Sequence, residues 1–357
     1  MNKASISIVG TGKIAKSLCQ ALACSSTLPP EIARRIQIIR RKRTNANLSF
    51  FRDYHVRMSK NIQFVAKSEY IILAVTPKGA GPILSKLKRV SFASDRPYTL
   101  ISFVSGLSRE QIKEALPKDA HINVIAATCN TNFVGGHALI AATDHHAFFT
   151  ELSEYVWKEN EEEILKSVFT IGTMNGLIYK ALSLALEADG VSGNISKWLR
   201  GLSDILRENK FPTALVSSTA TVSIGYEALL KFQSLMTGLL AEQPLFYRYD
   251  KAKDRVYRAF QSSLHALITY RGTVTTDTVE SFMKSVITKG GCTEKGITAL
   301  RTVEDLQSAE YLAEHVCMPI ILTLATFPGI VKESIKNPNL FSRWPSLKEA
   351  RFHKIRS

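Results

Sequence analysis

The stretch SISIVGTGKIA, residues 5–15, decides how the chain begins to fold. A short β-branched run ends at Gly10, and apolar residues then recur three and four apart over residues 13–24, which predicts a strand, a tight turn and a helix. The turn has the pattern G-x-G-x-x-A. In such a turn Gly10 permits the sharp bend, Gly12 leaves room for a pyrophosphate, and Ala15 lets the helix pack closely on the strand. The helix N-terminus would then face the phosphates.

Further alternation of strands and helices follows up to about residue 171. Apolar runs predict strands at residues 36–39, 70–75, 98–103, 121–125 and 138–142. Helical periodicity predicts helices at 79–87 and 108–116, where Ser108 and Gln111 form a capping-box pattern, and an acidic helix around 145–163. Alternation of this kind is typical of a parallel sheet with crossover helices.

From about residue 172 nearly every segment has helical periodicity. Helices are predicted at 178–187, 196–208, 219–240, 254–270, 278–287, 293–301 and 308–316. The fold class expected is therefore α/β, with an N-terminal Rossmann-type domain built on a mainly parallel sheet, followed by an all-α domain. We place the sheet domain at residues 1–171, the helical domain at 172–335 and a basic tail at 336–357. The apolar excess of the helices indicates mutual packing or burial by a partner subunit.

Composition excludes several classes of protein. The 357 residues are 45% hydrophobic and 22% charged, enough for a substantial core. The longest apolar run, residues 318–330, is interrupted by Pro319, Pro328 and Gly329, which argues against a membrane span; with no signal-peptide pattern, a cytosolic location is expected. Five widely spaced cysteines without a C-x-x-C pair indicate neither a disulfide framework nor a structural zinc site, and we expect no metal.

The net charge of +15 is concentrated in the first part of the chain. Residues 1–160 carry 22 lysines and arginines against 11 acids, whereas the remainder carries 24 against 20. A basic surface attracts polyanions, so it is compatible with nucleic acid as well as with a phosphorylated cofactor.

Arg40-Arg41-Lys42-Arg43 follows the second predicted strand, where a carboxylate would accept hydrogen bonds from a ribose 2′-hydroxyl. Guanidinium groups instead suit a 2′-phosphate, which favours NADPH over NADH. A solvated basic loop or a nucleic-acid patch is the alternative interpretation. Val75-Thr76-Pro77 ends a later strand at the sheet edge that would border the cofactor.

Two loops carry hydroxyl and glycine residues. Thr288-Lys289-Gly290-Gly291-Cys292-Thr293 precedes a predicted helix, so its free N–H groups and the helix dipole could hold a carboxylate. A simple capped helix start is an equal alternative. Thr128-Cys129-Asn130-Thr131 follows a strand and could be an ordinary turn. Because no histidine or acid motif accompanies Cys129 or Cys292, neither is expected to be a nucleophile.

These motifs, in this order, resemble the pyrroline-5-carboxylate reductase family over most of the chain. That family combines an N-terminal G-x-G-x-x-G/A with a strand ending in A-V-K-P, an N-T-P loop, an S-G-S-G-P-A-Y helix start and a P-G-G-[TA]-T loop. Here the corresponding stretches are residues 10–15, Ala74-Val75-Thr76-Pro77, Asn130-Thr131-Asn132, Val191-Ser192-Gly193-Asn194 and residues 289–293.

The resemblance implies a homodimer or a multiple of one, and hydride transfer from NADPH to the C=N carbon of a cyclic imine, most simply 1-pyrroline-5-carboxylate, giving L-proline. It implies that Thr293 and Thr288 are catalytic, with the substrate carboxylate held by Gly290, Gly291, Cys292, Thr293 and Asn194. The cofactor residues expected are Gly10, Thr11, Gly12, Lys13, Ile14, Arg40, Arg41, Asn61, Ala74, Val75, Thr76, Pro77 and Asn130.

Several positions depart from the family pattern. Thr76 replaces the lysine of A-V-K-P, Asn132 replaces the proline of N-T-P, Lys289 precedes the glycine pair, and Ser196-Lys197-Trp198 stands at Pro-Ala-Tyr. Residues 231–278 are additional sequence of unassigned role. A different cyclic imine or a ketimine acid is therefore an alternative substrate, and a non-catalytic relative that binds nucleic acid or a partner through its basic half is a second alternative.

Overall fold

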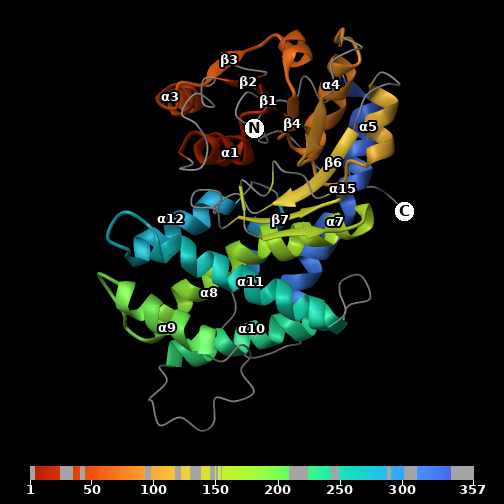
Figure 1. Ribbon diagram of the computed structural model, residues 1–357. Helices are drawn as coiled ribbons and strands as arrows, with labels where there is room; N and C mark the ends of the chain where they lie inside the picture. The colour runs from red at the N-terminus through yellow and green to blue at the C-terminus, as the bar shows by residue number, and fades with distance from the viewer. Residues whose placement is uncertain are drawn as a thin grey trace.

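The computed structural model describes residues 5–24, 35–40, 45–92, 98–116, 122–128, 138–144, 149, 152–153, 155–208, 224–242, 249–287, 291–300 and 312–338. A sheet half lies above a helical half (Figure 1). The sheet order is β3-β2-β1-β4-β5-β6-β7-β8. The strands are β1 (Ile6–Val9), β2 (Ile36–Ile39), β3 (Arg57–Ser59), β4 (Tyr70–Leu73), β5 (Thr99–Ser102), β6 (Ile122–Thr128), β7 (Leu139–Ala142) and β8 (Tyr155–Lys158).

Strand order confirms the doubly wound fold expected from the sequence. All neighbouring strands run parallel except β6 and β7, which pair antiparallel. The first six strands follow the order 3-2-1-4-5-6, in which the strand order reverses between the parallel neighbours β1 and β4. Ligands of such sheets bind outside the carboxyl ends of the strands at this reversal. The fold therefore points to the segments that follow β1, β2 and β4.

Helices flank the sheet and form most of the remaining residues that the structure describes. In the sheet half they are α1 (Lys13–Cys24), α3 (Asn45–Asp53), the 3-10 helix η1 (Ile62–Lys67), α4 (Pro77–Leu87) and α5 (Arg109–Ala115), whose predicted Ser108–Gln111 capping box is present. The helical half contains α7 (Glu161–Ser167), η2 (Val168–Thr173), α8 (Met174–Ala188), α9 (Ser196–Glu208), α10 (Ile224–Glu242), α11 (Tyr249–Ile268), α12 (Thr276–Val286), α13 (Cys292–Leu300), η4 (Leu312–Cys317) and α15 (Met318–Lys336).

Apolar packing joins the two halves. On one face of the sheet, Ile6 and Ile8 pack with α1 through Leu18 and Leu22. The other face belongs to a larger cluster that extends from β4 and α4 into α8, α11 and α13. The core is thus continuous past residue 171, and the boundaries placed there and at residue 335 stay predictions.

The predicted acidic helix around residues 145–163 is wrong, because residues 155–158 form strand β8 beside β7 and α7 begins only at Glu161. Buried Glu159 follows β8 and pairs with Lys251 Nζ at 2.7 Å and Arg255 Nη2 at 2.8 Å, both from α11. The Arg255 guanidinium also lies 3.7 Å from the Trp157 ring centroid. Part of the additional sequence, 231–278, therefore anchors the helical half to the sheet edge.

Helix α15 was not among the predicted helices, and Pro328, which interrupts the apolar run in the sequence, lies inside it. The segment Leu312–Lys336 is long and apolar enough to cross a membrane, a test that core helices also pass. Here α15 packs on α4, where a Cβ on Gly81 would overlap the carbonyl oxygen of Ser334. The Ser334 hydroxyl accepts a 3.0 Å hydrogen bond from Gly81 N. This close backbone contact fixes the last described helix to the sheet half.

Candidate active site

Gly10 directly follows β1, at the point where the strand order of the sheet reverses. Its φ of +132° favours glycine, and a Cβ there would overlap the carbonyl oxygen of Ala74 after β4. Gly10 N donates to Ile39 O of β2 at 3.0 Å. The turn is therefore packed directly against the neighbouring strands, as the predicted strand–turn–helix requires.

Gly12 is exposed, and the nearest atom to a Cβ placed on it is Ala74 O at 4.0 Å. Protein packing alone does not require glycine here, whereas a group lying against the turn would. Ala15 is fully buried, confirming its packing role. Because α1 begins at Lys13 without an acidic residue in its first turn, the positive end of the helix dipole is open to an anion.

Arg40 follows β2 and is half-buried. Its backbone N donates to Ser59 O at 2.9 Å, but its buried Nε and Nη1 have no hydrogen-bond partner among the described residues. Buried charged donors are normally paired. A phosphate group on the adenosine ribose would supply the missing acceptors, so this position fits NADP(H); Arg41 lies outside the described residues.

The other predicted cofactor residues follow β3 and β4. Asn61 caps η1 by accepting a hydrogen bond from Gln63 N at 3.0 Å. Ala74 is buried, Val75 is half-buried, and Thr76 is exposed at the N-cap of α4 with no side-chain capping bond. Pro77 is the first residue of that helix, and Asn130 is outside the described residues. Those predicted cofactor residues that the structure describes, including Thr11 and Ile14, lie next to the carboxyl ends of β1, β3 and β4.

The late glycine loop leads into α13. Thr288 and Gly290 lie outside the described residues, but Gly291, Cys292 and Thr293 form the start of the helix. Thr293 is buried, and its methyl group packs so closely on α8 that a Cβ on Gly176 would overlap it. A Cβ on Gly296 would lie 2.7 Å from side chains of both Leu177 and Ile320. Packing between α8 and α15 thus fixes α13.

Burial raises the pKa of the Cys292 thiol to about 12. A pKa in that range keeps the thiol protonated near neutral pH, and the thiolate is the reactive form of cysteine. A protonated thiol also places no negative charge beside the start of α13. Such a charge would repel a carboxylate.

Lys13 connects the dinucleotide turn with this late loop. Its Nζ donates to Lys284 O at 2.8 Å and to Ile287 O, both at the C-terminal end of α12. Ile287 is five residue steps from Cys292, and five extended steps span at most ~18 Å. Figure 1 shows α12 directly below α1. One chain therefore brings the G-x-G turn and the start of α13 to the same region, and the ammonium group of Lys13 is directed at carbonyl oxygens of α12.

Asn194 is not brought to this region. Its Oδ1 accepts from Ser196 N at 3.0 Å at the start of α9, and Ile195 N donates to Val274 O, near the N-terminal end of α12. The 11 residues of α12 separate that end from Ile287 by about 16 Å. Trp198 of α9 donates to Asp189 Oδ2 at 2.9 Å, so its indole holds α9 to the end of α8. A substrate role for Asn194 stays a prediction.

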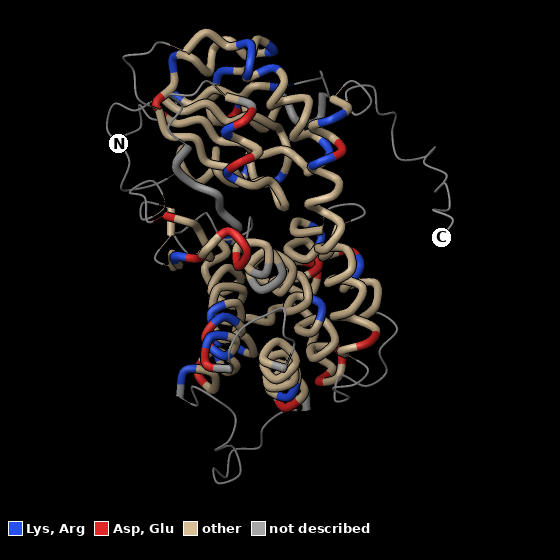
Figure 2. Tube along the Cα trace, turned by 90° about the vertical axis from the view of Figure 1, so that its right-hand side faces the viewer, with Lys and Arg blue, Asp and Glu red and all other residues tan. Residues whose placement is uncertain are grey.

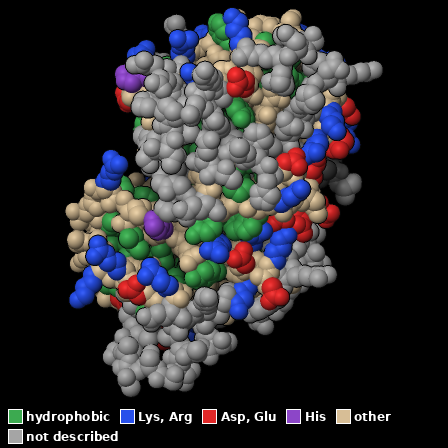
Figure 3. All heavy atoms as spheres, viewed as in Figure 1, with side chains coloured by type: hydrophobic (Ala, Val, Ile, Leu, Met, Phe, Trp, Pro, Cys, Tyr) green, Lys and Arg blue, Asp and Glu red, His purple; other side chains and the backbone are tan. Residues whose placement is uncertain are grey.

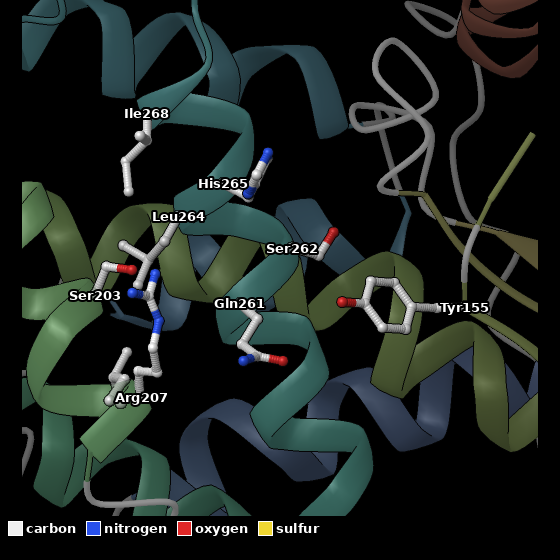
Figure 4. Close-up of a pocket in the computed structure, with 9 residues that line it drawn as sticks. Tyr155, Ser203, Arg207, Gln261, Ser262, Leu264, His265 and Ile268 are labelled. Carbon is white, nitrogen blue, oxygen red and sulfur yellow. The ribbon is translucent and has the colours of Figure 1, made fainter.

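A separate cavity of about 190 Å³ lies between α9, α11 and β8, and none of the predicted site residues lines it (Figure 4). It is smaller than typical ligand pockets. Its cation, Arg207, is 75% exposed and lies 3.8 Å from Asp204. No group of three or more metal-binding side chains occurs in the described part of the chain.

Residues 5–106 match the family described as NADP oxidoreductase, coenzyme F420-dependent. The match includes the G-x-G turn, Arg40 and Thr76-Pro77. This part of the chain is therefore similar to that oxidoreductase family. No curated protein matches the sequence.

Three solved structures illustrate which folds are similar. Pyrroline carboxylate reductase of Plasmodium falciparum with NADP bound is 12% identical, with 93% of this chain and 99% of that chain covered and a TM-score of 0.42. The Streptococcus pyogenes 1-pyrroline-5-carboxylate reductase is 14% identical, with 92% and 100% covered and a TM-score of 0.45. The 3-hydroxyisobutyrate dehydrogenase of Mycobacterium tuberculosis is 12% identical, with 79% and 98% covered and a TM-score of 0.39.

Proposed function

We propose that the protein reduces a carboxylate-bearing cyclic imine with NADPH, and that the imine is 1-pyrroline-5-carboxylate, giving L-proline. The observation that carries the proposal is the contact from Lys13 to the end of α12, which supports a shared site for the G-x-G turn and α13. The choice of this particular imine rests on the resemblance of the sequence motifs to the pyrroline-5-carboxylate reductase family.

The proposed division of roles follows from the local geometry. Gly10, Gly12 and the first turn of α1 hold the pyrophosphate, and Arg40 holds the 2′-phosphate, which favours NADPH over NADH. When bound, the reduced nicotinamide supplies the hydride. The N–H groups at the start of α13 and the Thr293 hydroxyl hold the substrate carboxylate.

Little acid–base machinery is needed for this reaction. A protonated imine is already electrophilic, so correct orientation of donor and acceptor provides most of the acceleration. Hydride transfer to the carbon of the protonated imine gives a neutral secondary amine, and the proton that converts this amine to its ammonium form comes from water or a threonine hydroxyl. Thr293 therefore acts chiefly by fixing the imine carbon opposite the cofactor edge of the sheet.

The first experiment follows NADPH oxidation at 340 nm with 1-pyrroline-5-carboxylate, with a panel of other cyclic imines and ketimine acids beside it. Turnover of the pyrroline acid supports the proposal. Turnover of only another imine would change the substrate, and the absence of oxidation with every compound across neutral pH would refute a reductase.

Thr293→Val is expected to raise the KM for the imine about tenfold or more, because a hydrogen bond to a charged carboxylate is lost while the methyl packing is retained. Thr293→Ser is the matched control: it keeps the hydroxyl but loses the methyl contact with α8, so it should lower thermal stability and leave KM nearly unchanged. Equal KM values for Val and wild type would remove Thr293 from the site.

We also propose that the protein is a homodimer, as the family resemblance implies. Residues 318–331 of α15 carry no charge, and Met318 and Leu322 are 42% and 61% exposed. Hydrophobic side chains also reach the surface elsewhere on the helical half (Figure 3). A second copy would cover such a stripe. Light scattering should give the mass of two chains, and Leu322→Glu should halve it; a monomeric wild type would contradict this.

A further inference from the structure

Lys13 is placed unusually for a residue in a dinucleotide-binding turn. It is the first residue of α1, where the positive end of the helix dipole disfavours a cation. Burial of the ammonium group lowers its pKa, which also indicates an environment that opposes the charge. A long side chain held in one conformation loses rotamer entropy as well. The contacts that Lys13 makes must offset these costs.

Those contacts lie at the end of α12. The last carbonyl groups of a helix lack partners within the helix and form the negative end of its dipole, so an ammonium group is stabilised there. α12 has a lysine of its own in its last turn, but the Nζ of that residue, Lys284, donates to Glu280 Oε2 at 2.7 Å. Lys13 instead caps α12, by donating to Lys284 O and Ile287 O across 271 and 274 residues of sequence.

This cap acts at Ile287, after which the structure describes the chain again from Gly291, directly before α13. The backbone of Ile287 has left the helical conformation, with φ of −70° and ψ of 124°, and residues 288–291 lead from it to α13. The other end of that connection is fixed by the packing of α13 against α8 and α15. Lys13, which is next to Gly12 in the sequence, therefore contacts the end of α12, from which the chain continues to Thr293.

We propose that Lys13 is a positioning residue: its ammonium group, by holding the C-terminal end of α12, sets the separation of the dinucleotide turn and the substrate-binding start of α13. This inference rests on the proposed function. It assigns to Lys13 a role different from the cofactor binding expected from the family resemblance. Misplacement of reacting groups by about 1 Å can cost about 100-fold in rate, so such a link has kinetic consequences.

The experiment compares Lys13→Met, which keeps the aliphatic stem, with Lys13→Arg, which keeps the charge. Lys16→Met is the matched control on the same helix, because Lys16 lies over the Phe50 ring at 5.2 Å and within the sheet half. For each variant, NADPH Kd is measured by fluorescence titration, and imine kcat and KM are measured at saturating NADPH.

Lys13→Met should leave NADPH Kd within about threefold of wild type but lower kcat/KM for the imine about tenfold or more. Lys13→Arg should recover part of that loss, and Lys16→Met should change neither quantity. A tenfold weaker NADPH Kd in Lys13→Met with unchanged imine kinetics would instead make Lys13 a phosphate ligand. No change in any quantity would overturn the proposal.

Amide hydrogen exchange over residues 284–293 supplies a readout that does not depend on activity. Loss of the cap should speed exchange in this segment in Lys13→Met and not in Lys16→Met. If wild type reduces no imine, the proposed function fails while exchange still tests the contact. Unchanged exchange in Lys13→Met would refute the contact, even in an active enzyme.

Discussion

Gly81→Ala is expected to lower the free energy of unfolding by about 1–3 kcal/mol, because overpacking against backbone cannot be relieved by a side-chain rotation. The added Cβ would overlap the carbonyl of Ser334, so α15 has to move away from α4. That movement also breaks the 3.0 Å hydrogen bond between Gly81 N and the Ser334 hydroxyl. Denaturant unfolding followed by circular dichroism measures the change.

Gly238→Ala is the control for Gly81→Ala. Gly238 also lies within a helix, α10, but a Cβ added there would have no atom of another described element within 4 Å. Alanine there should stabilise the protein by up to ~1 kcal/mol through helix propensity. Equal stability of Gly81→Ala and wild type would mean that α15 does not pack on α4 as described.

Arg40→Met is expected to weaken NADPH binding about 10- to 100-fold while leaving NADH binding nearly unchanged. A charge-assisted hydrogen bond to a phosphate contributes about 1.5–3 kcal/mol, and 1.4 kcal/mol corresponds to tenfold in Kd. The basis is the pair of buried guanidinium nitrogens, Nε and Nη1, that lack partners among the described residues. Methionine fills the same volume as the arginine stem, so folding should be retained.

The measurement is a fluorescence titration of wild type and Arg40→Met with each dinucleotide. NADH is the internal control, since it lacks the 2′-phosphate. An equal loss of affinity for both dinucleotides would indicate that Arg40 supports the fold of the turn. Unchanged affinity for both would remove Arg40 from the cofactor site.

The basic surface has a simple electrostatic consequence. In Figure 2 lysine and arginine predominate on the sheet half, whereas the helical half mixes both signs. A field of this kind attracts a phosphorylated dinucleotide as it attracts nucleic acid, so charge alone does not choose between them. We base the proposal of a dinucleotide on the G-x-G turn and Arg40, which are local features with defined geometry.

Local signals were strong enough to predict much of the fold. The bounds of α1, β2 and α9 agree with those expected, because each has clear periodicity and a turn or cap beside it. Strands β3 and β8 were missed: Arg57–Ser59 and Tyr155–Lys158 are extended because a neighbouring strand pairs with each of them. Pairing of that kind overrides weak local preference.

Long-range contacts could not be predicted in the same way. Pro328 interrupts an apolar run in the sequence, but α15 continues through it. The same helix packs closely on the sheet half at Gly106 and Gly81, and the sequence gives no sign of these contacts. The motif at Lys13 predicts a residue near phosphate, whereas its partners lie more than 270 positions away and carry no side-chain signature, because they are backbone carbonyls.

Titration of the wild-type protein with NADPH, with salt-dependent retention of DNA measured on the same preparation, tests the central claim most directly. We predict saturable NADPH binding, tighter than NADH binding, with no retention of DNA at physiological salt. Failure to bind either dinucleotide, together with salt-sensitive DNA binding, would contradict the account.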